Sequence, residues 1–288
     1  MQSLRAVNPA SRVVPKWAAG LIAHMVQRAP PVVSLEVIAR YLEACQSTVE
    51  PAVALSRLVR LGWLRRTHFN GAYAFLPPGV ESLADPYIDL RSWRLTKPSA
   101  RFFLAGSSAA WHLGYLDRRP EHPAIWLEDQ VPFPKALRGR VSRVTTLFPQ
   151  GISAQALAPS VKLLRARGLD LLNWAEGLPG FGPEALLVQI ASRPVSFDAW
   201  VDFAGRLADF CADIELSRLA PLLEVATGAT RQRAVYLLRL GGKRGVLSLL
   251  PKTMQATKIG TSGPAHWDSR TSVSDHVVAP LLTANNKA

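Results

Sequence analysis

The dipeptide Asn70-Gly71 restricts the fold of this chain more than any other local feature. It separates two segments rich in aromatic and aliphatic residues, 63–69 and 72–76. Asn-Gly in this setting is the strongest short signal for a β-hairpin, because a type I′ turn needs a positive φ at both central residues. Pro77-Pro78 then ends the second segment, since proline has no amide N–H to donate to a neighbouring strand. The sequence therefore predicts a hairpin with a type I′ turn at Asn70-Gly71.

Helices are predicted before this hairpin. The first covers 15–28, where Trp17 belongs to an apolar series with a four-residue rhythm that indicates a core face. The second covers 34–44, whose apolar residues recur on one helical face. Ser34 can accept from the free N–H groups at the start of this second helix, as an N-cap residue does.

A further helix is predicted over 48–61. Ser47 and Glu50 flank its start at capping-box spacing, and Pro51 is tolerated in the first helical turn. Gly62 is expected to end it. Helix, tight turn, helix and hairpin is the element order of a winged helix-turn-helix, which we place at residues 1–80.

The helix over 48–61 has two chemically different faces at 100° per residue. Its predicted core face is Ala52, Leu55, Leu58, Val59 and Leu61. The opposite face suits a DNA major groove, because arginine can bind guanine O6 and N7 and a valine methyl can contact the thymine methyl. Basic residues of the hairpin would contact the flanking backbone or minor groove. The predicted DNA-binding residues are Ser47, Thr48, Val49, Val53, Ser56, Arg57, Arg60, Arg65, Arg66, His68 and Asn70.

Two other interpretations of these residues stay open. The basic side chains could only hydrate the surface, and a winged helix can also serve as a protein–protein interaction module. The charge distribution favours double-stranded DNA: residues 1–80 hold nine Lys/Arg against three Asp/Glu, whereas residues 81–238 hold eighteen against sixteen. Residues 1–14 are expected to be a loose basic arm with Arg5 and Arg12.

The rest of the composition indicates a protein of the cytoplasm. The whole chain has 288 residues and a net charge of +13, which favours a polyanionic partner. Its two cysteines, Cys45 and Cys211, have neither metal-ligand spacing nor a disulfide framework, so both are expected to be small buried residues. We find no secretory signal and no apolar run approaching the roughly 18 residues of a membrane span, so no membrane partner is expected.

Residues 81–94 contain proline and small polar residues and are predicted to be a connector. Beyond it, 95–288 is predicted to be a larger mixed α/β domain, which makes the whole chain α+β. His112 lies among apolar residues and is expected to be structural. The predicted strands are 102–105, 124–127, 141–148, 168–172 and 246–250. The predicted helices are 107–114, 185–191, 197–211, 216–226 and 230–240, and 277–282 is expected to dock on the core.

No catalytic constellation emerges from the sequence. A metal-dependent nuclease needs clustered carboxylates, often with a lysine two residues beyond one of them. Glu-x-Lys occurs nowhere in the chain, and the six histidines are scattered without ligand spacing. We therefore expect no enzyme activity, no metal and no cofactor.

Two stretches of the chain, taken together, resemble the AbiEi-type antitoxins. One is the predicted winged helix that ends in Gly71-Ala-Tyr-Ala-Phe-Leu-Pro77. The other is Phe103-Leu-Ala-Gly-Ser-Ser-Ala-Ala-Trp-His-Leu-Gly-Tyr115, followed at a distance by Gly182-Pro-Glu-Ala-Leu-Leu187. The actinobacterial branch is the most similar, judging by Leu90-Arg-Ser-Trp93 and by the segment 109–117. The resemblance covers about 15–282, and the order of its motifs is more specific than any one of them.

This resemblance implies a DNA-binding antitoxin that represses its own operon through the winged helix. It also implies that the C-terminal domain counteracts a nucleotidyltransferase-like toxin. The alternatives are a stand-alone winged-helix transcriptional regulator and a protein-interaction module that does not bind DNA. Salt dependence separates DNA binding from the last of these, because log K falls with log[salt] by about 0.9 per phosphate contacted.

Overall fold

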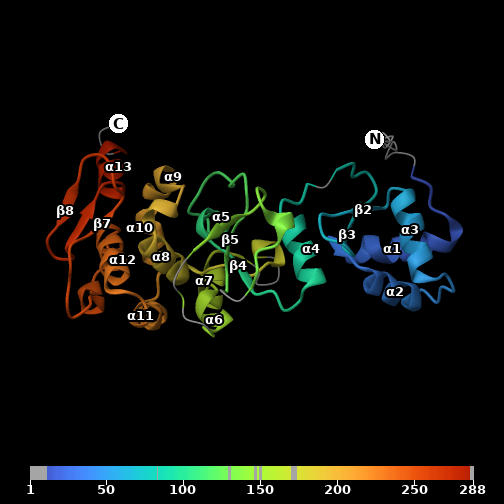
Figure 1. The fold of residues 1–288 in the computed structure, drawn as a ribbon, viewed down its shortest axis with the longest axis horizontal. Helices are drawn as coiled ribbons and strands as arrows, with labels where there is room; N and C mark the ends of the chain where they lie inside the picture. Colours follow the sequence, from blue (N-terminus) through green and yellow to red (C-terminus); the bar gives the residue numbers. More distant parts are fainter. Residues whose placement is uncertain are drawn as a thin grey trace. The chain divides into compact units, whose positions relative to one another are not determined.

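The computed structural model describes residues 12–82, 84–128, 131–145, 148, 151–169 and 174–285. The chain divides into two compact units. Unit 1 is Met1–Ala100 with Pro134–Arg138, and unit 2 is Arg101–Phe133 with Gly139–Ala288. The described residues form helices and three small three-stranded sheets, so the fold is α+β, as predicted (Figure 1).

Unit 1 consists of helices and a small sheet that a hairpin completes (Figure 1). The strands β1, β3 and β2 lie in that order and are antiparallel, with Val33 opposite Tyr73 and Arg66 opposite the same residue on its other side. The sequence did not predict β1, which has only two residues and no periodicity to detect. The elements are η2 (Lys16–Ala18), α1 (Ala19–Arg28), β1 (Val32–Val33), α2 (Leu35–Ala44), α3 (Pro51–Arg60), β2 (Leu64–Arg66), β3 (Tyr73–Phe75), α4 (Ile88–Thr96) and η3 (Lys135–Leu137).

Local backbone chemistry sets the ends of α2 and α3. Ser34 caps α2 as predicted, and its side chain accepts from Val37 N at 3.3 Å. Gln46 (φ 52°) closes the same helix in the left-handed region. Gly62 (φ 79°) does so after α3, where Trp63 N donates to Leu58 O at 2.9 Å. The predicted stop at Gly62 is confirmed.

The predicted start of the third helix is wrong by about one turn. The helix begins at Pro51, and Glu50 adopts an extended conformation (φ −60°, ψ 131°) without capping through its side chain. Proline disfavours the helical region for the residue before it and is itself preorganised for the first helical position. The Ser47 hydroxyl instead accepts from Val49 N at 3.4 Å, in a local turn.

The hairpin is confirmed, but its turn is not type I′. Ala72 N donates to Phe69 O at 3.1 Å, so Asn70-Gly71 does occupy the two central positions. Only Gly71 has a positive φ, 82°, whereas type I′ needs one at both residues. The strands pair as far as Arg66 and Tyr73, and the longer loop between them removes the twist constraint that selects type I′ turns.

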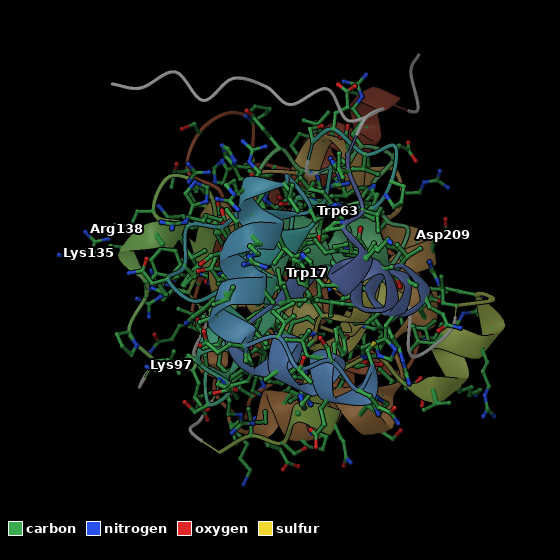
Figure 2. The ribbon with its side chains drawn as sticks, turned by 90° about the vertical axis from the view of Figure 1, so that its right-hand side faces the viewer. Trp17, Trp63, Lys97, Lys135, Arg138 and Asp209 are labelled. Carbon is green, nitrogen blue, oxygen red and sulfur yellow. The ribbon has the colours of Figure 1, made fainter. Side chains whose placement is uncertain are left out.

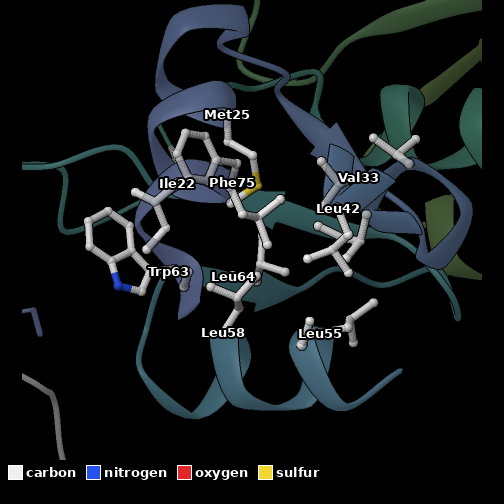
Figure 3. Packing of buried hydrophobic residues seen from close by; sticks show 14 residues of the cluster. Ile22, Met25, Val33, Leu42, Leu55, Leu58, Trp63, Leu64 and Phe75 are labelled. Carbon is white, nitrogen blue, oxygen red and sulfur yellow. The ribbon is translucent and has the colours of Figure 1, made fainter. Parts of the chain in front are cut away.

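Fourteen buried residues form the core of unit 1 (Figure 3). On α3 the inward residues are Ala54, Leu55 and Leu58, whereas Ala52 is exposed. The predicted core face therefore wrongly included Ala52. It also missed Ala54, because a single alanine does not distinguish a buried position from an exposed one. The predicted connector 81–94 also contains the first turns of α4, whose Trp93 is buried.

The second sheet opens unit 2, and the buried helix α8 packs against α5, the helix that follows β4. β5 pairs with β4 antiparallel and with β6 parallel. Every residue of α8 from Pro183 to Ala191 is buried. The elements up to this helix are β4 (Phe102–Leu104), α5 (Gly106–His112), β5 (Ala124–Leu127), β6 (Ser142–Val144), α6 (Ala154–Leu157), α7 (Val161–Ala166), η4 (Trp174–Gly177) and α8 (Pro183–Ser192).

Unit 2 continues with helices and a third sheet (Figure 1). The predicted helix 197–211 is two helices, and the predicted strand 246–250 is the 3-10 helix η6. The sheet β7-β9-β8 was not predicted, and much of the predicted strand 168–172 lies outside the described residues. The elements are η5 (Pro194–Ser196), α9 (Trp200–Ala204), α10 (Leu207–Asp213), α11 (Leu216–Glu224), α12 (Gly228–Leu240), η6 (Val246–Leu249), β7 (Thr257–Ile259), β8 (His266–Asp268), β9 (Val273–Asp275) and α13 (Val278–Asn285).

Candidate nucleic-acid interface

The outward face of α3 carries the residues that the sequence predicts to contact DNA. Val53, Ser56, Arg57 and Arg60 are all exposed and lie at successive turns of the helix. With Ala52 they line a depression of 570 Å³ on the surface of unit 1. The face therefore offers two guanidinium groups, a hydroxyl and small apolar groups side by side.

Arg57 has a contact that the sequence did not indicate. Its guanidinium carbon lies 5.8 Å from the centre of the Trp17 ring, within the range of a cation–π interaction. Trp17, labelled in Figure 2, comes from η2 and packs against the core of unit 1. The indole therefore limits the directions in which the Arg57 side chain can extend, while its guanidinium stays at the surface.

The residues before α3 that were predicted to contact DNA are not all exposed. Thr48 is exposed, and Ser47 is half-buried with its hydroxyl used in the turn to Val49. Val49 was expected to face outward, but it packs against the core of unit 1. It precedes the helix and so does not follow the 100° periodicity from which its direction was inferred.

The basic hairpin residues are at the surface. Arg65 and Arg66 are exposed on β2, which is an edge strand, and Asn70 is exposed in the turn. His68 differs from them: its Nδ1 lies 2.8 Å from Asp89 Oδ1 on α4, and its side chain is 49% exposed. The Asp89 carboxylate therefore orients the His68 side chain.

Arg12 was predicted to belong to a loose arm, and this is wrong. Its guanidinium donates to Leu76 O at 2.6 Å and to Val80 O at 2.6 Å, and it also stacks over Trp63 at 5.6 Å. Burial, opposed by the nearby charge of Glu81, lowers the pKa of Arg12. Arg12 thus joins the chain before α1 to the end of the hairpin, whereas Arg5 lies outside the described residues.

In the core of unit 2, the first antitoxin-like stretch, 103–115, meets residues on either side of the second, 182–187. Phe181 N donates to Leu104 O at 2.9 Å, and Gly106 N donates to the Gln189 side chain at 2.7 Å. Gly106 (φ 53°) needs the conformational freedom of glycine at this position. The motif residues therefore join β4 and α5 to α8.

A buried carboxylate belongs to this same contact. Glu184 is 1% exposed and accepts from Glu215 N at 2.9 Å, and Arg218 Nε lies 3.7 Å from its second oxygen. Burial raises the pKa of Glu184, opposed by these partners. The carboxylate therefore attaches the start of α11 to α8, which is a structural role.

His112 packs between tryptophan rings, with centroid distances of 4.7 Å to Trp111 and 6.3 Å to Trp174. Burial, and secondarily the charge of Arg119, lowers its pKa to about 4. The imidazole is therefore neutral near pH 7, which agrees with a structural residue. Within the described ranges, no group of three or more His, Cys, Asp or Glu could hold a metal ion. No helix among the same residues has both the length and the apolar character to cross a membrane.

Comparison with known proteins agrees with this arrangement. The model of the AbiEi antitoxin C-terminal domain matches residues 102–240, which include both motif stretches of unit 2. The crystal structure of the RV2827C protein from Mycobacterium tuberculosis is 40% identical, with a TM-score of 0.83, and the match covers 96% of this chain and 97% of that one. Among curated proteins, none matches this chain in sequence. On the family model and this full-length structural similarity, the chain belongs to the AbiEi-type antitoxin family.

Proposed function

We propose that unit 1 is a winged helix-turn-helix that binds double-stranded operator DNA and represses the operon that encodes the protein. In this proposal α3 enters the major groove, and Arg65 and Arg66 contact the adjacent backbone. The DNA-binding domain would cover residues 1–80, with a connector at 81–94 and the antitoxin domain at 95–288.

One observation carries the proposal: the arginines of α3 and β2 are exposed and uncompensated. Within the described residues, Arg57, Arg60, Arg65 and Arg66 form no ion pair with a carboxylate. Four uncompensated guanidinium groups on one recognition helix and the following strand favour a polyanion. The hydroxyl of Ser56 and the methyl groups of Val53 add the polar and apolar contacts with which base edges are distinguished.

DNA binding can be measured by fluorescence anisotropy with the DNA upstream of the gene. Arg57→Ala/Arg60→Ala should lose about 1–3 kcal/mol for each arginine that is bidentate to a base, and should discriminate less between operator and unrelated DNA. Arg65→Ala/Arg66→Ala should weaken both DNAs alike and make the salt dependence shallower by about one unit per lost phosphate contact.

The matched control is Arg28→Ala/Arg40→Ala, which removes the same charge from exposed positions on α1 and α2. Equal losses in the control and in the α3 variant would show that only net charge matters. Unchanged affinity in the α3 variant would remove the assignment of α3. A salt slope near zero for the intact protein would favour the protein-interaction module instead.

We also propose that unit 2 counteracts a nucleotidyltransferase-like toxin in the cytoplasm without catalysing a reaction. Membership of the antitoxin family supports this role. Expression from a separate promoter isolates it from repression: Arg57→Ala/Arg60→Ala should still rescue growth of cells that express the product of the adjacent gene. Loss of rescue in this variant, at unchanged protein level, would contradict the separation of the two roles.

A further inference from the structure

A pocket of 580 Å³ on unit 2 has an unusually basic lining. Its volume falls in the range of about 300–1,000 Å³ that is typical of small-ligand sites. The end of α8 and η5, the middle of α12, and β7 with the loop after it all contribute to its wall. The six lining residues with polar side chains are Ser192, Arg193, Ser196, Arg233, Lys258 and Thr261, and no described lining residue is acidic.

Arg233 is held rigidly at the inner wall. Its Nη1 donates to Ala191 O at 3.1 Å and to Ser192 O at 3.4 Å, the last carbonyls of α8. Its Nε is buried without a hydrogen-bond partner among the described residues. Burial lowers the pKa of this guanidinium. Neutral carbonyls alone thus face a partly buried positive charge, which is a costly arrangement unless an anion compensates it.

Arg193 and Lys258 add two further positive charges to the lining. Both are exposed, and neither forms an ion pair within the part of the chain that the structure describes. Lys258 lies on β7, an edge strand, and Arg193 lies directly after α8. Like charges that share a concave surface raise the local positive potential, because the protein walls focus the field.

We propose that this pocket binds the phosphate groups of a small phosphorylated ligand. Two arginines and one lysine supply charge-assisted donors, and Thr261 adds a hydroxyl, a set that matches an oxygen-rich dianion. The hydroxyls of Ser192 and Ser196 instead donate to Gln189 O and to Arg193 O, each at 2.8 Å. The donors surround one concavity and come from three separate segments, an arrangement that suits a compact anion better than an extended polymer. The site belongs to unit 2 and does not depend on the DNA-binding role proposed for unit 1.

Isothermal titration calorimetry of the intact protein with pyrophosphate, at constant ionic strength, tests the proposal. We expect saturable binding that Arg193→Gln/Lys258→Gln weakens at least tenfold, since two of the three charges are lost. Arg233 is left intact because it also holds the end of α8. The control Arg244→Gln/Lys252→Gln removes the same charge from exposed residues outside the pocket and should bind pyrophosphate as the unaltered protein does.

The source of the phosphate follows from a second titration. Tighter binding of ATP than of pyrophosphate, lost in the same double variant, would support a nucleotide ligand, whereas equal binding would support a free polyphosphate. Absence of saturable pyrophosphate binding would overturn the proposal, as would equal weakening in the control. Weaker duplex DNA binding by Arg193→Gln/Lys258→Gln, without pyrophosphate binding by the intact protein, would overturn it in favour of a nucleic-acid surface.

Discussion

Replacing Gly182 by alanine tests how closely the family motif is packed. Gly182 precedes α8, and its N–H donates to Leu157 O at 2.7 Å. A Cβ at this position would lie 2.7 Å from both N and Cα of Pro159 and 2.8 Å from Ala158 O. Real Cβ atoms essentially never approach so closely, and all three neighbours are backbone atoms that no rotamer change can move.

The size of the effect follows from two opposed contributions. Overpacking that shifts backbone costs about 1–3 kcal/mol. The lower entropy of alanine in the unfolded chain returns about 0.4–1 kcal/mol, because the Gly182 backbone (φ −73°, ψ 173°) is open to any residue. The two ranges leave a net loss of up to about 2.6 kcal/mol of unfolding free energy, equivalent to a Tm lowered by up to about 10 °C for a domain of this size.

Gly205→Ala is the matched control for this measurement. Gly205 is exposed in a helical conformation (φ −63°), and its Cβ would meet only Asp202 O at 3.8 Å. It should gain about 0.4–1 kcal/mol through the unfolded state. Urea unfolding followed by tryptophan fluorescence and by circular dichroism would give both values. Equal stability of Gly182→Ala and Gly205→Ala would refute the claim that α8 begins against the 158–159 backbone.

Three further predictions concern charge and reactivity. The His112 pKa of about 4 lies below the ordinary 6.5, so the contribution of neutral His112 to folding stability is complete above pH 6.5 and is lost as the pH falls toward 4. His112→Gln should therefore reduce the difference in unfolding free energy between pH 7 and pH 5 by about 1–2 kcal/mol, after allowance for partial exposure. An unchanged difference would contradict this. Cys211 is buried as expected, whereas Cys45 is only partly buried. Burial raises the pKa of the Cys211 thiol to about 12, so iodoacetamide at pH 8 should label Cys45 much faster than Cys211, as peptide mass spectrometry would show. Comparable rates would mean that Cys211 is accessible. Arg12→Lys keeps the charge but loses the donation of two guanidinium nitrogens to the carbonyls of Leu76 and Val80. The unfolding free energy of unit 1, measured by chemical denaturation, should therefore fall by about 1–2 kcal/mol. No loss would show that Arg12 contributes only charge.

Local patterns in the sequence were sufficient for much of unit 1. The apolar periodicity of α2 and α3, the serine cap at Ser34 and the glycine stop at Gly62 each act within a few residues, so each can be recognised without a fold. The outward direction of Arg57 and Arg60 followed from the same periodicity. The errors arose where a neighbour overrides a motif: Pro51 excludes Glu50 from α3, and the length of the hairpin loop decides the turn at Asn70-Gly71.

The tertiary structure alone decided the contacts that join distant segments. The parallel pairing of β7 with β9 brings together residues that no local periodicity relates, and Trp17 meets Arg57 across forty residues of chain. The pocket at Arg193, Arg233 and Lys258 collects three cations that appear in the sequence as ordinary surface charges. A sequence pattern indicates which face of a helix or strand is apolar. It does not indicate which element covers that face, because the free energy of burial depends on the apolar area and the fit of two surfaces and not on their positions in the sequence.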